Sequence, residues 1–269
     1  MVGVFELLAI NAAISAACFV GLWLVGIAIK DVTFVDAWWA LGMVVLAFAS
    51  YVQTGMPVTA HSVALLALCT AWGVRLGAYL LLRWNRNGPD RRYRTMLGRA
   101  KTDRGWGFAT SSLLLVFALQ YPLQFVVSLP VQLGQAAPTA APLGPIAIAG
   151  LVIGVIGFLF ESIGDFQLTL FKGDPANQGK VMDKGLWRYT RHPNYFGDAC
   201  VWIGLFLIAA ETRFGVWSLP APILITFLLT RWSGVPTVEG RLRRSRPGYE
   251  DYVARTSGFV PWFPKAVSK

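Results

Sequence analysis

Polar residues cluster in the run LWRYTRHPNYFGD, at the start of an apolar stretch. Six of them fall within 11 positions: Arg188, Arg191, His192, Asn194, Tyr195 and Asp198. Pro193 suits the first turn of a helix, where its missing N–H leaves no hydrogen bond unmade. Asn194 and Asp198 are four residues apart and share one face of that helix. A helix N-terminus lined by arginine and histidine favours an anion, because its dipole and free N–H groups attract negative charge.

The alternative interpretation of this cluster is a membrane-surface belt with snorkelling arginines. Such a belt explains Arg188. It does not explain Asn194 and Asp198, which lie further into the apolar run.

A second polar group lies on the preceding apolar stretch. Its members follow one another at steps of 4, 3, 4 and 4 and therefore share one helix face: Gly150, Gly154, Gly157, Glu161 and Asp165. Glycines allow close approach of another helix, and ionisable groups in an apolar span are candidates for function. The alternative is that both carboxylates lie at the membrane interface and meet water or Lys172.

The third candidate is Asp36, in the run VTFVDAWWALG. Asp36 is either an N-terminal cap within an aromatic belt or, if the helix begins earlier, a side chain directed into a helix bundle. In the second case Arg75 and Tyr79, one turn apart in the next apolar stretch, could meet it there.

The composition indicates the elements that must position these residues. Of the 269 residues, 55% are hydrophobic and 14% are charged, whereas soluble domains average about 45–50% and about 25%. About 20 apolar residues cross a bilayer as a helix. Seven stretches qualify, at 4–28, 37–54, 60–82, 107–129, 143–163, 195–211 and 214–231. We therefore expect an all-α integral membrane protein, a seven-helix bundle that forms a single membrane domain over residues 1–269.

The basic residues predict the orientation of the bundle. All of the 24 Lys and Arg except Arg75 and Arg213 lie in segments that alternate across the seven spans. The positive-inside rule then places the N-terminus outside and the C-terminus in the cytoplasm. Because the net charge of +10 is explained by topology, we expect the bilayer as a partner and no nucleic acid. The three cysteines lie in apolar stretches and form no ligand pair, so we expect no metal.

Basic cytoplasmic segments, embedded carboxylates and a helix N-terminus together favour a phosphate-rich ligand that enters from the cytosol. No Gly-x-Gly-x-x-Gly run follows a strand, so a Rossmann domain is not expected. The same charge could serve anionic lipid head groups, and a non-enzymatic lipid-binding protein is therefore an alternative.

The run from Gly185 to Asp198 and the tail RPGYEDYVARTSGFVPWFP resemble the C-terminal signature of the sterol reductases and steroid 5α-reductases. The resemblance is closest to a bacterial branch of integral membrane proteins with a steroid 5α-reductase-like C-terminal domain. It covers residues 141–264 as a cofactor side and the helices of 1–140, by topology alone, as a substrate side. It implies a bacterial inner-membrane enzyme of lipid metabolism. Such an enzyme transfers a hydride from NADPH to a carbon–carbon double bond of an apolar enone or a sterol- or lipid-like substrate.

The resemblance also assigns cofactor residues. Asn194 and Asp198 match the Asn and Glu of the 5α-reductase cofactor motif, with Asp in place of Glu. Asp165 matches an Asp on the preceding helix, and Glu161 stands where those enzymes have Asn. The remaining positions implied for the cofactor are Asn85, Lys172, Lys180, Arg191, His192, Tyr195 and Arg231.

The 5α-reductases hold the substrate ketone with a Glu on the second helix and a Tyr on the third. Asp36 is the candidate for the first, and Trp72 or Tyr79 falls near the second, so we expect Asp36 and Tyr79 to be catalytic. Hydride delivery to an enone builds charge on the carbonyl oxygen, and a tyrosine hydroxyl beside a protonated carboxyl would stabilise that charge.

The isoprenylcysteine carboxyl methyltransferases carry a similar Arg-His-Pro-x-Tyr motif and bind S-adenosylmethionine there. They commonly have an aliphatic residue where this chain has Asn194, so the second carboxylate site together with Asn194 and Asp198 favours the reductases. A methyltransferase of this type stays an alternative.

Overall fold

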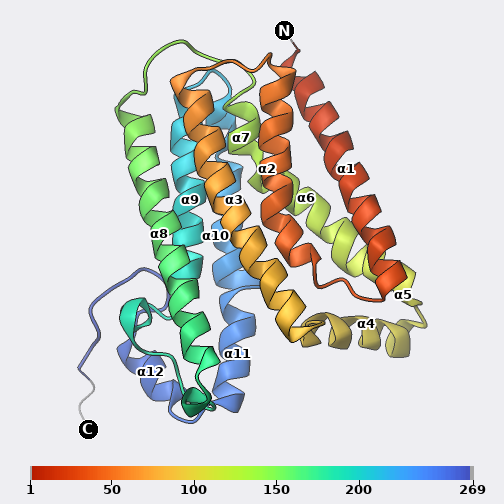
Figure 1. Ribbon diagram of the computed structural model, residues 1–269, viewed down its shortest axis with the longest axis vertical. Helices are drawn as coiled ribbons and strands as arrows, with labels where there is room; N and C mark the ends of the chain where they lie inside the picture. Colours follow the sequence, from red (N-terminus) through yellow and green to blue (C-terminus); the bar gives the residue numbers. More distant parts are fainter. Residues whose placement is uncertain (1, 267–269) are drawn as a thin grey trace. The chain divides into compact units, whose positions relative to one another are not determined.

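The computed structural model describes residues 2–266, in which helices are the regular structure and no strand occurs. Within residues 2–266, six helices are long and apolar enough to cross a membrane. They are α1 (Val4–Ile29), α2 (Val35–Gln53), α3 (Ala60–Asn87), the helix Phe108–Val127, α8 (Pro145–Gly173) and α9 (Pro193–Ala210). By length and composition, these helices confirm an all-α, multi-pass membrane protein (Figure 1).

The helix Phe108–Val127 is continuous but not uniform. It consists of α5 (Phe108–Ser112), the π-helical segment η1 (Leu113–Phe117) and α6 (Ala118–Val127). Pro122 lies inside α6. A π-helical turn interrupts the regular hydrogen-bond ladder of a helix, and such turns are frequent at functional sites.

The seventh predicted span, at 214–231, is divided among shorter segments. These are the 3₁₀ turn η4 (Gly215–Ser218), α10 (Pro220–Phe227) and the π-helical segment η5 (Leu228–Trp232). A proline begins α10 because it cannot donate to the preceding turn. Each segment is shorter than the about 20 residues that a span needs. The count of seven spans and the orientation of the termini stay predictions.

The chain divides into two compact units. Unit 1 comprises Met1–Ile148 and Leu205–Ala221, and unit 2 comprises Ala149–Gly204 and Pro222–Lys269.

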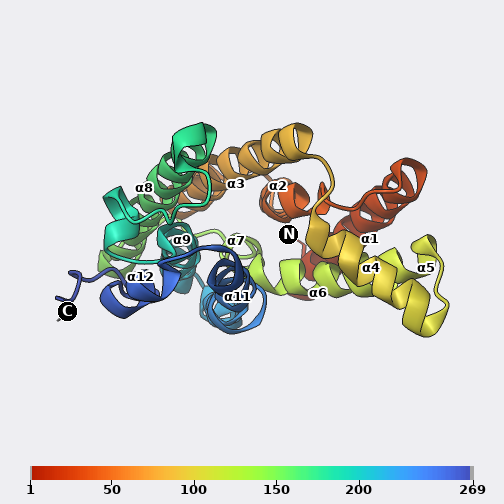
Figure 2. The same cartoon turned by 90° about the horizontal axis from the view of Figure 1, so that it is seen from below.

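In unit 1, α4 (Arg91–Arg104) lies across the lower ends of α1 and α6 (Figures 1 and 2). The side chain of Asp90 caps α4 by accepting from the N–H of Arg92, and Gly105 ends it in the left-handed conformation. Leu97 and Ala100 are the buried residues of α4. Leu97 joins a core whose other buried members are Phe19, Val32, Phe34, Val35, Val116 and Phe117. This apolar contact holds a strongly basic helix against the membrane helices.

A network of buried amides links α1, α2 and α7 (Leu129–Leu133) in unit 1. Asn11 donates to the Ser50 hydroxyl at 2.8 Å and to the Gln132 side-chain oxygen at 3.0 Å, and Gln53 donates to the Asn11 oxygen at 2.8 Å. Buried amides are costly unless they are hydrogen-bonded, so the network favours one arrangement of these helices.

In unit 2, α8 and α9 approach each other closely through glycines. A Cβ atom at Gly197 would lie 2.5 Å from the carbonyl oxygen of Gly157 and 2.5 Å from the backbone nitrogen of Glu161. A Cβ atom at Gly204 would lie 2.5 Å from the carbonyl oxygen of Gly150. The prediction that the glycine face of residues 150–165 packs against another helix is confirmed.

Candidate functional site

The polar pair at the centre of unit 2 is formed by Asp165 of α8 and Asn194 of α9. The Asn194 amide nitrogen donates to Asp165 Oδ1 at 3.1 Å, and Asn194 Oδ1 accepts from the backbone N–H of Tyr195 at 3.1 Å. Gly164 makes this approach possible, because a Cβ atom there would already lie 3.2 Å from the Pro193 ring. Two positions far apart in the sequence, which the resemblance assigns to one cofactor site, are therefore in contact.

Two further carboxylates extend this pair along both helices. Glu161 lies one turn before Asp165 on α8, and both are buried, with 2% and 4% of their surface exposed. Asp198 lies one turn after Asn194 on α9 and is half-buried. The pair and its two neighbours bring three carboxylates and one amide together on two helices, and these are the group types that bind hydroxyl and carboxamide groups.

The other cofactor candidates of unit 2 are arranged around the first turn of α9 and at the surface. Tyr195 stacks face to face on His192, with 5.3 Å between ring centroids. Lys172 at the end of α8, Lys180 in the following loop and Arg231 of η5 are exposed. Their exposure leaves long cationic side chains able to reach a solvent-facing phosphate.

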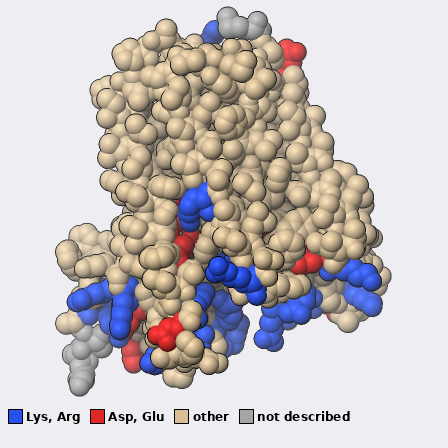
Figure 3. Space-filling model, in the orientation of Figure 1, with Lys and Arg blue, Asp and Glu red and all other residues tan. Residues whose placement is uncertain are grey.

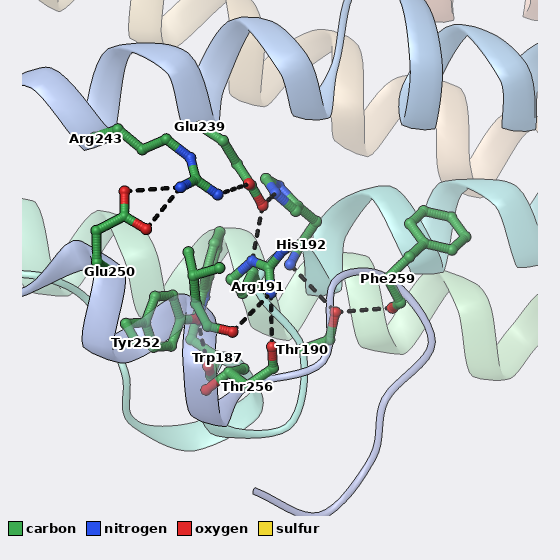
Figure 4. Close-up of polar contacts among 11 residues, drawn as sticks. Trp187, Thr190, Arg191, His192, Glu239, Arg243, Glu250, Tyr252, Thr256 and Phe259 are labelled. Atoms are coloured by element: carbon green, nitrogen blue, oxygen red, sulfur yellow. Dashed lines mark hydrogen bonds and ion pairs between the residues drawn. The ribbon is translucent and has the colours of Figure 1, made fainter. Parts of the chain in front are cut away.

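Arg191 and His192 converge on one buried carboxylate, Glu239 of α11 (Val235–Ser245) (Figure 4). Arg191 Nε donates to Glu239 Oε1 at 2.8 Å, and His192 Nε2 lies 3.0 Å from the same oxygen. Arg191 Nη1 also donates to the carbonyl of Thr256 at 2.7 Å. Burial by itself would raise the pKa of Glu239. The hydrogen bonds from His192 and Arg191 outweigh that effect and lower the pKa to about 2. Glu239 is therefore an anion at neutral pH, and these contacts fix the start of α9.

The C-terminal segment packs on the residues that precede α9. Tyr252 of α12 (Tyr249–Arg255) donates to the carbonyl of Trp187 at 2.5 Å, and Thr190 donates to the carbonyl of Phe259 at 2.8 Å. The Trp187 indole donates in turn to the carbonyl of Gly164 on α8 at 3.0 Å. Sequence reasoning missed Glu239, although it is the single acidic residue between Trp232 and Tyr249 and lies in a basic tail.

Unit 1 holds a tyrosine–carboxylate pair built on Asp36, in the first turn of α2. The Tyr93 hydroxyl donates to Asp36 Oδ1 at 2.5 Å, and Arg92 Nη2 donates to Oδ2 at 3.2 Å. Gln120 of α6 donates to the Tyr93 oxygen at 3.2 Å. Burial and the neighbouring Asp36 raise the pKa of Tyr93 well above its ordinary value, so this hydroxyl keeps its proton. That single proton is donated to Asp36, so the hydroxyl can donate to a ligand only after it turns away from the carboxylate.

The hydroxyl bound to Asp36 thus comes from Tyr93 of α4, which sequence reasoning missed. Tyr79, the predicted partner, lies on α3 and is half-buried, and Asn85 lies near the exposed end of the same helix. Tyr93 belongs to the basic segment WNRNGPDRRYR, whose charge masked its single tyrosine. Across residues 2–266, no group of three His, Cys, Asp or Glu side chains is arranged to hold a metal ion.

Comparison with known proteins gives one short match and one long one. Over 72 residues the chain is 31% identical to a protein named "Probable O-methyltransferase ustE" from Ustilaginoidea virens, a match that covers 27% of this chain and 25% of that protein. The chain therefore aligns with only a quarter of that relative. No solved structure shows a significant match. The long match covers residues 22–256, and on this basis the chain belongs to the family described as "Protein of unknown function (DUF1295)".

Proposed function

We propose that this chain is a membrane-embedded oxidoreductase that uses NADPH to reduce a carbon–carbon double bond in an apolar enone or a sterol- or lipid-like substrate. The observation that carries the proposal is the hydrogen bond between Asn194 and Asp165. These two residues come from different helices and are the ones that the reductase resemblance assigns to a common cofactor site. The methyltransferases commonly have an aliphatic residue at the position of Asn194, so their signature does not account for this amide–carboxylate pair.

The residues present fit a dinucleotide. Asn194, Asp165 and Asp198 would bind its hydroxyl and carboxamide groups, and Lys172 and Lys180 would pair with its phosphates. When bound, NADPH supplies the hydride, and the protein orients it.

The residues at the start of α9 and the remaining cofactor candidates would have different roles. Arg191 and His192 hold the start of α9 through Glu239 and so position Asn194. The proposed set of cofactor-binding residues also includes Tyr195, Glu161, Asn85 and Arg231.

On substrate binding the Tyr93 hydroxyl would turn away from Asp36 and donate its single hydrogen bond to the substrate carbonyl oxygen, where negative charge develops as hydride arrives. Asp36 would act as a positioning residue, because it holds the Tyr93 hydroxyl in place until the substrate arrives. Tyr79 stays a second candidate for contact with the substrate.

Ligand binding to the full-length protein in nanodiscs tests the proposal. Calorimetry should show tighter binding of NADPH than of S-adenosylmethionine. Asn194→Ala should weaken NADPH binding by about tenfold or more, the loss expected for one buried hydrogen bond of about 1.4 kcal/mol. Asn87→Ala, at the exposed end of α3, is the matched control and should bind as the wild type does. Tighter binding of S-adenosylmethionine would refute the reductase.

The second candidate function is an S-adenosylmethionine-dependent methyltransferase. The printed name of the curated relative favours it, together with the Arg-His-Pro-x-Tyr run. In that case the protein should transfer a labelled methyl group from S-adenosylmethionine to a membrane-soluble acceptor, and Asn194→Ala should leave binding of that cofactor unchanged.

The proposal includes a location in the bacterial inner membrane, with the N-terminus outside and the C-terminus in the cytoplasm. The distribution of Lys and Arg among the connecting segments supports this orientation. The run from Pro220 to Trp232, which forms α10 and η5, would then serve as a short seventh crossing.

A further inference from the structure

A cavity of about 470 Å³ lies within unit 1, and none of its lining residues is among those proposed for the cofactor. Its walls come from the connection between α1 and α2, from α4 and from the start of α5. Three cationic side chains line it, Lys30, Arg94 and Lys101. A volume of this size suits a small-molecule group, since ligand pockets run from about 300 to about 1,000 Å³.

The charge of the cavity is positive. Asp31 is its one acidic lining residue, and its oxygens are already used. Oδ1 accepts from the backbone N–H and the hydroxyl of Thr33 at 2.9 and 2.7 Å, and Oδ2 accepts from the Trp84 indole at 2.7 Å. Burial by itself would raise the pKa of Asp31, but these hydrogen bonds outweigh that effect and lower the pKa below its ordinary value. Asp31 therefore stays ionised, and its oxygens are occupied by neutral donors.

The cations, in contrast, are available to a ligand. Within the described part of the chain, no ion pair joins Lys30, Arg94 or Lys101 to a carboxylate. Three cations against one engaged carboxylate leave a net attraction for an anion. A phosphate ester, with several charged oxygens, can contact two or three cations at once.

The rest of the lining is amphipathic. Val32, Leu97 and Phe108 supply apolar surface, and Trp106 lies beside them. The guanidinium of Arg104 lies 4.8 Å from the Trp106 ring centre, a pairing typical of the membrane–water boundary. Lys and Arg side chains gather at this end of unit 1, around α4 (lower right in Figure 3). A ligand with a phosphate and an apolar portion would satisfy both parts of the lining.

We propose that this cavity binds a phosphate ester, with Lys30, Arg94 and Lys101 as its contacts. The ester is either the head group of an anionic membrane lipid or a soluble compound, and the two sources share the same recognition chemistry. Tyr93 also lines the cavity, but the proposal depends on the three cations and not on the proposed reduction.

The test uses the full-length protein purified in a zwitterionic detergent, with binding followed by native mass spectrometry. Three probes are compared: short-chain phosphatidylglycerol, phosphatidylcholine of the same chain length and glycerol 3-phosphate. The wild type should bind phosphatidylglycerol at least about tenfold more tightly than phosphatidylcholine. Lys30→Gln/Lys101→Gln should remove that preference, and Lys30→Arg/Lys101→Arg should keep it.

The matched control is Arg86→Gln/Arg99→Gln, which removes the same charge from exposed positions that do not line the cavity. It should keep the preference for phosphatidylglycerol. If this control loses as much binding as the cavity variant, a diffuse basic surface is responsible and the proposal is overturned. Equal binding of both lipids together with no binding of glycerol 3-phosphate would overturn it as well. Glycerol 3-phosphate binding as tight as that of phosphatidylglycerol, and lost in the cavity variant, would support the site and identify a soluble ester as its source.

Discussion

Glu239 holds Arg191 and His192 at the start of α9, and its replacement by glutamine keeps an acceptor oxygen but removes the negative charge that pairs with Arg191. Because breaking a buried charge pair on one side costs about 3–5 kcal/mol, Glu239→Gln should lower the free energy of unfolding by an amount near the lower end of that range. Thermal unfolding in detergent measures the change. Glu250→Gln is the control, because the Glu250 side chain is 66% exposed and its pair with Arg243 is a surface contact. An equal loss from both variants would contradict a structural role for Glu239.

The depressed pKa of Glu239 also predicts a pH dependence. Its pKa falls from an ordinary value of 4.5 to about 2 on folding, so its contribution to stability is fully present above about pH 4.5 and disappears as the pH falls toward 2. The difference in unfolding temperature between the wild type and Glu239→Gln should therefore narrow over that interval. A difference that stays constant down to pH 2 would show that Glu239 is not the responsible group.

Tyr93 carries the proton in the tyrosine–carboxylate pair of unit 1. Tyr93→Phe removes the hydroxyl that Asp36 binds while the ring stays in place. We expect NADPH affinity to be unchanged and turnover of an enone to fall about 10²–10⁴-fold, the usual contribution of a positioned proton donor. NADPH oxidation, followed by absorbance, measures both quantities. Tyr79→Phe is the comparison: if it abolishes turnover and Tyr93→Phe does not, Tyr79 is the catalytic residue.

At the scale of elements, the close contact between α8 and α9 determines where Asn194 lies. Gly197→Ala would place a Cβ atom 2.5 Å from backbone atoms of α8, so the two helices must separate. Overpacking of this kind costs about 1–3 kcal/mol. We expect a lower unfolding temperature and weaker NADPH binding, because Asn194 is carried away from Asp165.

Gly21→Ala on α1 is the matched control for this contact. Nothing lies within 4 Å of a Cβ atom at Gly21, and alanine favours helix by about 1 kcal/mol over glycine. This variant should be as stable as the wild type or slightly more so. If Gly197→Ala behaves in the same way, the close contact of α8 and α9 does not limit stability.

At the scale of the whole molecule, the proposed topology predicts which side of the membrane each connection faces. In a background without native cysteines, Ala140→Cys should react with a membrane-impermeant maleimide in intact cells, whereas Arg99→Cys should react only after permeabilisation. Both positions are exposed, so the label can reach either once it is on the correct side. The reverse pattern would place the N-terminus in the cytoplasm.

The sequence by itself determined the features that depend on local pattern. Long apolar runs predict seven spans, six of which are helices long and apolar enough to cross a membrane within residues 2–266. A helical repeat of glycines predicts a face that packs against another helix. Helical spacing also placed Asp165 with Glu161 on one face and Asn194 with Asp198 on another. The resemblance to the reductases, and not the spacing, assigned Asn194 and Asp165, which are 29 residues apart, to one site.

Only the tertiary structure decided the partners that come from distant elements. Tyr93 binds Asp36 across 57 residues, and Arg191 binds Glu239 across 48. Hydrophobic periodicity specifies which face of a helix is buried but not which element covers it. The polar contacts of α4 and α11 depend on how these basic helices pack on the membrane helices of their own units. For that reason the basic charge of α4 and α11 predicted only a cytoplasmic surface. The contacts of Tyr93 with Asp36 and of Glu239 with Arg191 could be identified only in the tertiary structure.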